Sequence, residues 1–228
     1  MASILDSVKT LVQDSNPFIK IAALSFFVFM VNQVVSNQST TPAFKNILIV
    51  MTALVLIGYV FESIHNNISE AEVILPDLFN PLRTILIGAY GVLVLSPYIA
   101  LIYYGMTWIN SFLTFLPWVN YMILTIAFLT LFALLGVGML LFCKKYNPLE
   151  ALNLVKVFGS AGDFIVYNFT LAIGLLVFVS LTFLPIGFFV KITFGYGLVF
   201  DYYIIFALVF ILMSITQYYS QLYAEYIG

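Results

Sequence analysis

The sequence predicts an all-α integral membrane bundle of about six transmembrane helices, arranged as three hairpins, with one or two short amphipathic helices at the membrane surface. Two observations support this prediction. Hydrophobic residues make up 63% of the 228 residues and the mean hydropathy is +1.11, whereas a soluble domain is roughly half apolar. The apolar runs also approach the roughly 20 residues that a helix needs to cross a membrane. We therefore treat residues 1–228 as a single transmembrane domain.

The N-terminal residues predict a short surface helix rather than a membrane span. Its apolar side chains recur at helical spacing opposite polar ones: Ile4, Leu5, Val8, Leu11 and Val12. We expect this interfacial helix over residues 3–14, although a frayed polar tail would fit the same residues. The stretch has neither the basic start nor the unbroken apolar centre of a cleavable signal peptide.

Six apolar segments follow, each bounded by charged or turn-forming residues. They are residues 18–35, 47–65, 85–108, 118–142, 164–184 and 202–223. The third contains Pro97, a candidate kink, because proline has no amide N–H to donate within the helix. Pro185 is expected to end the fifth segment. Between the fourth and fifth, the amphipathic residues 146–159 predict a second interfacial helix.

Three Asn-Pro pairs, beginning at Asn16, Asn80 and Asn147, precede outward-going segments. Asparagine caps a helix and proline fits its first turn, so each pair predicts a helix start. The recurrence is consistent with three duplicated hairpins. It is also consistent with chance, because short matches are common in a sequence of such biased composition.

Lysine and arginine predict the orientation. If the N-terminus is cytoplasmic, six of these residues lie on the inner side and two, Lys45 and Lys191, on the outer side. We therefore expect both termini in the cytoplasm. The tyrosines near the end of the last segment are expected at the inner membrane surface: Tyr218, Tyr219, Tyr223 and Tyr226.

Residues 61–84 concentrate the polar chemistry of a chain that is only 8% charged. Glu62 and Arg83, together with Lys20 from the first segment, are expected to form a polar clasp at the base of the first hairpins. A functional carboxylate at Glu62 is the alternative. The remaining acidic residues of the stretch are expected to face water or a partner: Glu70, Glu72 and Asp77.

The residue types exclude the familiar catalytic and metal sites. Glu62 and His65 share a helix face, but a di-metal bundle needs a second Glu-x-x-His motif and His65 is the only histidine. The single Cys143 excludes an internal disulfide and a cysteine metal cage. The middles of the six segments lack the ionisable residues of a proton or ion relay. We expect no catalytic, cofactor-binding or metal-binding residue, and no nucleic-acid surface at a net charge of −2.

Several short motifs resemble those of an uncharacterised prokaryotic family of multi-pass membrane proteins. They are Gly58-Tyr59 with the downstream Glu62, Leu75-Pro76-Asp77 before an apolar hairpin, and Gln221-Leu222-Tyr223-Ala224 after Tyr218-Tyr219. The similarity spans roughly residues 16–227. It implies six helices in a prokaryotic cytoplasmic membrane, and it implies no reaction or ligand.

Two functions remain open. The first is a non-enzymatic subunit or scaffold of a larger membrane assembly, in contact with lipids and other membrane subunits. The second is a permease for a neutral or lipid-like small molecule, suggested by Pro97, Gly88 and Gly91 in the third segment and expected to have a cavity between the third and fifth segments. A membrane enzyme using Glu62 and His65 on lipid headgroups is a more distant alternative.

Overall fold

The computed structural model describes residues 3–71, 73–76, 80–113 and 117–226, and these residues form helices and connections without a strand. The helices are α1 (Ile4–Gln13), α2 (Pro17–Ser36), α3 (Pro42–Ile68), α4 (Pro81–Phe112), α5 (Pro117–Lys145), α6 (Pro148–Ala151), α7 (Leu154–Leu181), α8 (Phe183–Phe194) and α9 (Leu198–Tyr226). Within the described residues, six helical stretches are long and apolar enough to span a membrane, with α7 and α8 counted as one. The predicted all-α membrane bundle is confirmed.

Proline opens most of the long helices, as its fixed backbone angle and missing N–H favour. In two of the three Asn-Pro pairs the asparagine side chain caps the helix. Asn80 accepts a hydrogen bond from the amide of Arg83 at 3.3 Å, and Asn147 accepts one from the amide of Leu149 at 3.0 Å. Asn16 instead adopts a left-handed backbone with φ of 56° and turns the chain from α1 into α2.

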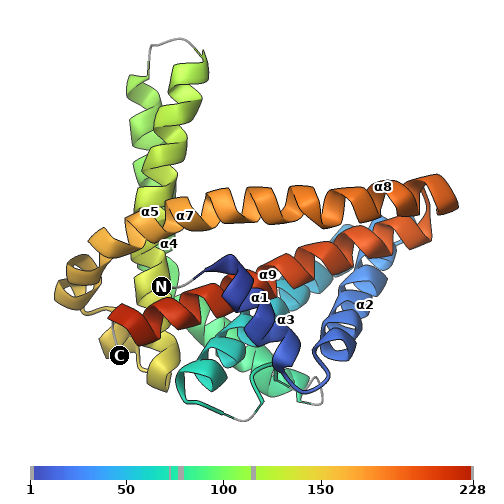
Figure 1. Ribbon diagram of the computed structural model, residues 1–228, viewed down its shortest axis with the longest axis horizontal. Helices are drawn as coiled ribbons and strands as arrows, with labels where there is room; N and C mark the ends of the chain where they lie inside the picture. Colours follow the sequence, from blue (N-terminus) through green and yellow to red (C-terminus); the bar gives the residue numbers. More distant parts are fainter. Residues whose placement is uncertain (1–2, 72, 77–79, 114–116, 227–228) are drawn as a thin grey trace.

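Helix α9 runs through the middle of the structure and contacts α1, α2, α3, α5 and α8. Figure 1 shows that the helices meet near the two chain termini and then separate into two arms. The end of α4 and the start of α5 form one arm, which extends away from the rest of the molecule, whereas the start of α4 packs against α3. Helices α2, α3, α8 and α9 extend together in a different direction and form the other arm.

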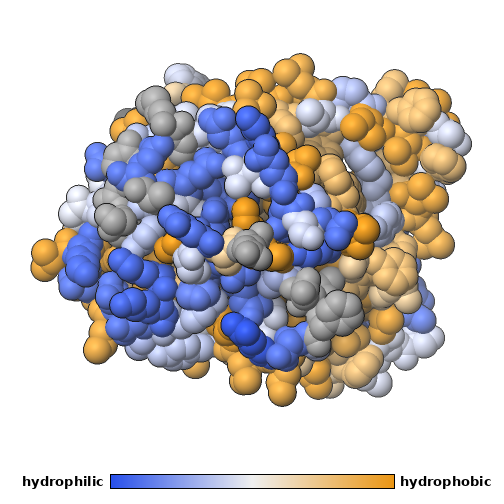
Figure 2. All heavy atoms as spheres, turned by 60° about the horizontal axis from the view of Figure 1, so that its bottom comes forward, coloured by the Kyte–Doolittle hydropathy of each residue, from blue (hydrophilic) through white to orange (hydrophobic). Residues whose placement is uncertain are grey.

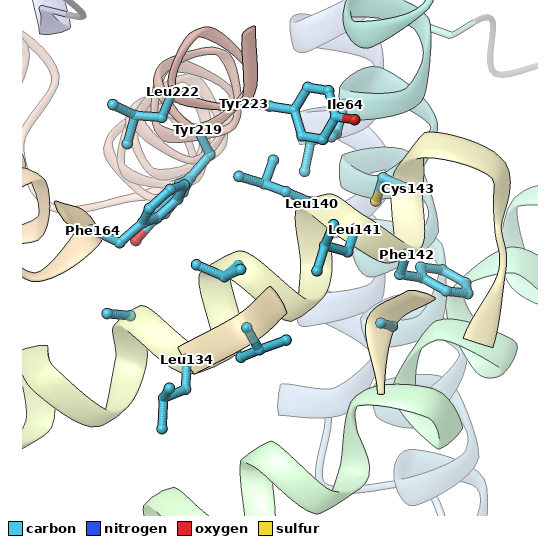
Figure 3. Close-up of a cluster of buried hydrophobic side chains, with 14 of the residues drawn as sticks. Ile64, Leu134, Leu140, Leu141, Phe142, Cys143, Phe164, Tyr219, Leu222 and Tyr223 are labelled. Atoms are coloured by element: carbon cyan, nitrogen blue, oxygen red, sulfur yellow. The ribbon is translucent and has the colours of Figure 1, made fainter. Parts of the chain in front are cut away.

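The C-terminal half of α9 lies in the core, contrary to the prediction that its tyrosines mark the membrane surface. The rings of Tyr219 and Phe164 stack with centroids 6.3 Å apart, and Figure 3 shows Leu222 and Tyr223 of α9 facing the same cluster. Burial of two of the tyrosines is possible because their hydroxyls find partners: Tyr219 donates to Asn168 Oδ1 at 2.6 Å, and Tyr218 donates to the carbonyl oxygen of Tyr167 at 3.1 Å. The side chain of Tyr226 lies outside the described residues.

The connection between α5 and α7 also differs from the prediction. Only the short α6 forms in the first part of residues 146–159, and α7 already begins at Leu154, so the second interfacial helix is absent from this described stretch. The side chain of Asn153 caps α7 by accepting from the amide of Lys156 at 3.3 Å. Residues 154–184 contain no proline, so no missing amide interrupts α7 as it continues into the apolar segment.

Helix α7 ends at Leu181, three residues before the predicted end of the fifth segment at residue 184, and Pro185 is not the residue that ends it. The interruption falls at Thr182, between α7 and α8. Pro185 then occupies the first turn of α8, where a proline costs no hydrogen bond. Gly195, with φ of 68°, ends α8.

Candidate functional site at the polar face

Hydrophilic side chains gather on the face of the molecule seen in Figure 2, bordered by apolar ones. This face is the lower side of Figure 1, where the chain passes from α3 to α4. A pocket of about 340 Å³ opens here between the end of α3 and the start of α4, and its polar lining includes Glu62, Asn66, Arg83 and Thr84. We take this pocket and its surroundings as the candidate functional site.

A buried carboxylate forms the base of the pocket. Glu62 is 6% exposed, and its two oxygens have different partners. Arg83 Nε lies 3.1 Å from Glu62 Oε1, and Thr84 Oγ1 donates to Glu62 Oε2 at 2.8 Å. The Arg83 side chain is 63% exposed, so water weakens this ion pair. The structure thus brings together two of the three residues of the predicted clasp.

Glycines explain why Glu62 can reach the start of α4. Gly58 lies one helical turn before Glu62, and a Cβ added there would be 1.9 Å from the carbonyl oxygen of Thr84. A Cβ at Gly88 would be 2.2 Å from the carbonyl oxygen of Leu54. The backbones of α3 and α4 therefore touch, as small residues allow in membrane helices. This contact carries Arg83 and Thr84 to the carboxylate.

Lys20 is not part of this pair, which corrects the predicted three-residue clasp. Its ammonium lies 3.5 Å from Asp14 Oδ2 and donates to the carbonyl oxygen of Leu75 at 2.7 Å. Asp14 in turn accepts from the amides of Ile74 and Leu75 at 2.9 Å and 3.1 Å. Lys20 and Asp14 thus tie the α1–α2 turn to the α3–α4 connection. Sequence analysis missed Asp14, since its partners are 60 and 61 residues away.

The acidic residues predicted to face a partner are only partly described. Glu70 is exposed just after α3, in a left-handed backbone with φ of 54°. Glu72 and Asp77 lie outside the described residues. Their role as partner-facing acids stays a prediction.

His65 does not join Glu62 in a common site, although the two share a helix face. Its Nδ1 lies 2.8 Å from the carbonyl oxygen of Cys143, and its ring lies 4.6 Å from that of Tyr146. Burial raises the pKa of the Tyr146 hydroxyl well above its usual value, which keeps this neighbour neutral. Among the described residues, no three His, Cys, Asp or Glu side chains are grouped as a metal site would require.

A buried polar network joins α9 to α1 and α3, and sequence analysis did not identify it. Gln217 donates to Ser63 Oγ at 3.1 Å and accepts from Asn67 Nδ2 at 2.7 Å. Gln221 accepts from Ser7 Oγ at 3.1 Å and donates to Thr10 Oγ1. Helix α1 therefore contacts α9 through Ser7 and Thr10 beside the buried Leu11. The other polar side chains of the predicted polar side, Asp6, Lys9 and Gln13, are exposed as expected. Isolated Gln and Ser residues in an apolar segment were the available signal.

Pro97, the candidate kink, lies within a helix that the structure shows as continuous from Pro81 to Phe112. Proline removes the amide that would bond to the carbonyl of Leu93, four residues earlier. Ser96 Oγ donates to that carbonyl oxygen at 2.8 Å instead. The preceding serine thus supplies the hydrogen bond that Pro97 lacks.

In comparisons with known proteins, no family, no curated protein and no solved structure matches this chain. The resemblance drawn from the short motifs stays a prediction, and a function for this chain has to be inferred from its geometry.

Proposed function

We propose that this protein is a non-enzymatic subunit or scaffold of a larger membrane assembly. The observation that supports the proposal best is the arm formed by α4 and α5, which leaves the rest of the molecule (Figure 1). A shallow groove on this arm is lined by residues of α4 and α5 alone. The large side chains that the arm exposes are mostly aromatic: Tyr103, Tyr104, Trp108, Phe112, Trp118 and Tyr121.

A pair of helices whose joined ends stand apart from the rest of the molecule is better suited to assembly than to a monomeric bundle. Membrane helices associate by close packing and interhelical hydrogen bonds, because lipid supplies no hydrophobic force between them. The separated arm offers two helix faces for such packing with the transmembrane helices of another protein. The polar face, at the opposite end of α4 from this arm, holds Glu62 and Arg83 already paired with each other, which suits a structural role.

A permease is the second candidate, and one observation favours it. An apolar groove of about 240 Å³ lies where the two arms diverge, lined by residues such as Val60, Leu95, Met139 and Leu212. Its walls come from α3, α4, α5 and α9, whereas the expected cavity lay between the third and fifth segments. Gly91, expected to leave space, packs against the ring of Phe61. For a solute to pass through this groove, the two arms that form its walls would have to move further apart.

The proposed location is a prokaryotic cytoplasmic membrane with both termini in the cytoplasm. The excess of Lys and Arg on the side of the termini, six residues against two, supports this orientation. The polar face with Glu62 would then meet the cytoplasm.

Native mass spectrometry after gentle extraction from the source membrane tests the proposed function. We expect the chain in a complex of fixed stoichiometry with at least one other protein. Replacing Tyr104 and Trp108 together with alanine should reduce the assembled fraction at least about tenfold, because both side chains lie exposed on the arm.

The matched control replaces Phe189 and Phe194 of α8, which are equally exposed aromatic residues on the other arm. This control should assemble like the unchanged protein. A lone monomer or homodimer in every sample would contradict the subunit proposal. A bound small molecule that is lost after substitution of Leu95 would favour the permease.

A further inference from the structure

A groove of about 560 Å³ runs along the surface between α8 and α9, far from the polar face. It opens toward the outside of the bundle, where lipid would surround the protein. Its walls are apolar side chains: Val179, Leu184, Phe188, Ile204 and Leu208. The groove therefore offers a surface for a hydrocarbon chain rather than for a polar solute.

A glycine and a tyrosine form the floor of this groove. A Cβ added at Gly187 would lie 2.9 Å from the ring of Tyr203, so only glycine leaves room for the ring against α8. The Tyr203 hydroxyl donates to the carbonyl oxygen of Phe183 at 2.5 Å. Because this hydroxyl is already bonded, the floor stays apolar.

The groove has about the length of one membrane leaflet. Its lining extends along α7 and α8 from Val179 to Lys191. Twelve helical steps correspond to about 18 Å. One leaflet of the hydrocarbon core is about 15 Å thick. A single acyl chain that enters from one membrane surface would fill this length.

Lys191 lies at the end of the groove and lacks an acidic partner among the described residues. Its ammonium lies 4.4 Å from the ring centroid of Tyr196, and the ion pairs within the described part of the chain do not involve it. Asp201, the nearest acid in sequence across the α8–α9 turn, is exposed. A cation at a membrane boundary favours an anionic partner, and the tyrosine ring leaves its N–H donors available.

We propose that the groove between α8 and α9 binds one anionic phospholipid, with an acyl chain between the helices and the phosphate at Lys191. The groove is apolar, has about the length of one leaflet and ends at a lysine that has no carboxylate partner among the described residues. It therefore complements such a lipid in both shape and charge. This inference is independent of the proposed assembly, because the groove lies on the arm opposite α4 and α5.

The test uses the purified full-length chain, depleted of lipid and titrated with phosphatidylglycerol or phosphatidylcholine of identical acyl chains. Native mass spectrometry counts the lipids that stay bound. The unchanged protein should retain one phosphatidylglycerol with an affinity about tenfold higher than for phosphatidylcholine. Lys191→Gln should abolish this preference, and Lys191→Arg should keep it. Lys45→Gln is the control, since Lys45 is also a half-buried lysine near a helix end but does not line the groove.

A second variant tests the acyl chain separately from the headgroup. Leu208 is 60% exposed in the groove wall, so Leu208→Trp should fill the groove without disturbing the core and should reduce retention of both lipids. Excess inorganic phosphate should not displace the lipid. The proposal is overturned if Lys191→Gln keeps the preference, if Lys45→Gln loses it equally, if Leu208→Trp retains both lipids, or if free phosphate displaces them.

Discussion

Single residues in this chain supply hydrogen bonds that the backbone loses inside the membrane. The carbonyl of Leu93 has no amide partner because residue 97 is proline, and Ser96 Oγ bonds to it at 2.8 Å. Water cannot replace this bond in hydrocarbon, so the serine and the proline should depend on each other. Sequence reasoning identified Pro97 but not Ser96, because a Ser-Pro pair is also a common way to begin a turn. The contact becomes evident only when α4 is seen to continue through both residues.

A double-mutant cycle tests this dependence. Ser96→Ala should destabilise the protein by about 0.5–1.5 kcal/mol, because the carbonyl of Leu93 loses its donor. In a Pro97→Ala background, the new amide at position 97 bonds to Leu93, so the same serine substitution should have almost no effect. Thermal unfolding in detergent measures the coupling between the two substitutions. Equal effects of Ser96→Ala in both backgrounds would contradict this account.

At the level of elements, the contact between α3 and α4 builds the candidate site. The apolar runs predicted the helices well, since length and composition decide which segments can cross a membrane. The pairing of Glu62 with Arg83 was also predictable, because the two charges lie on either side of one short connection. The contact of Lys20 with Asp14 and Leu75 could not be predicted from the sequence. It depends on how the turn after α1 and the connection after α3 meet in space.

Two glycine substitutions test the role of the α3–α4 contact. Gly58→Ala should destabilise the protein by about 1–3 kcal/mol, because its Cβ would overlap the carbonyl of Thr84 and push the helices apart. Gly162→Ala in α7 is the control: a Cβ there meets nothing within 4 Å, so alanine should be neutral or stabilise by up to about 1 kcal/mol.

Thermal unfolding compares the two glycine variants with the unchanged protein. Hydrogen exchange of the Thr84 amide is a separate readout. This amide should exchange faster only in Gly58→Ala, because the start of α4 moves away from Glu62 in that variant. If both variants unfold at the same temperature, close packing of α3 and α4 does not hold the site together.

For the whole molecule, the combined length of α7 and α8 raises the question of where the membrane begins. The two helices lie nearly in line in Figure 1 and cover 41 residues, which corresponds to about 60 Å, twice the thickness of a hydrocarbon core of about 30 Å. The predicted span of residues 164–184 covers only part of this helical stretch, and its position in the lipid stays a prediction. We infer that the first turns of α7, which include Lys156 and Asp163, extend beyond the lipid.

Cysteine labelling in membranes tests this inference and the proposed orientation together. Val155, Leu181 and Phe194 are 85%, 73% and 61% exposed, so packing within the protein should not limit the reaction at any of them. A membrane-impermeant maleimide should label Val155→Cys in inside-out vesicles, Phe194→Cys in intact cells, and Leu181→Cys in neither, because Leu181 would lie within lipid. The native Cys143 is fully buried and should give little background. Strong labelling of Leu181→Cys would place the membrane elsewhere along α7, and labelling of Val155→Cys from intact cells would reverse the orientation.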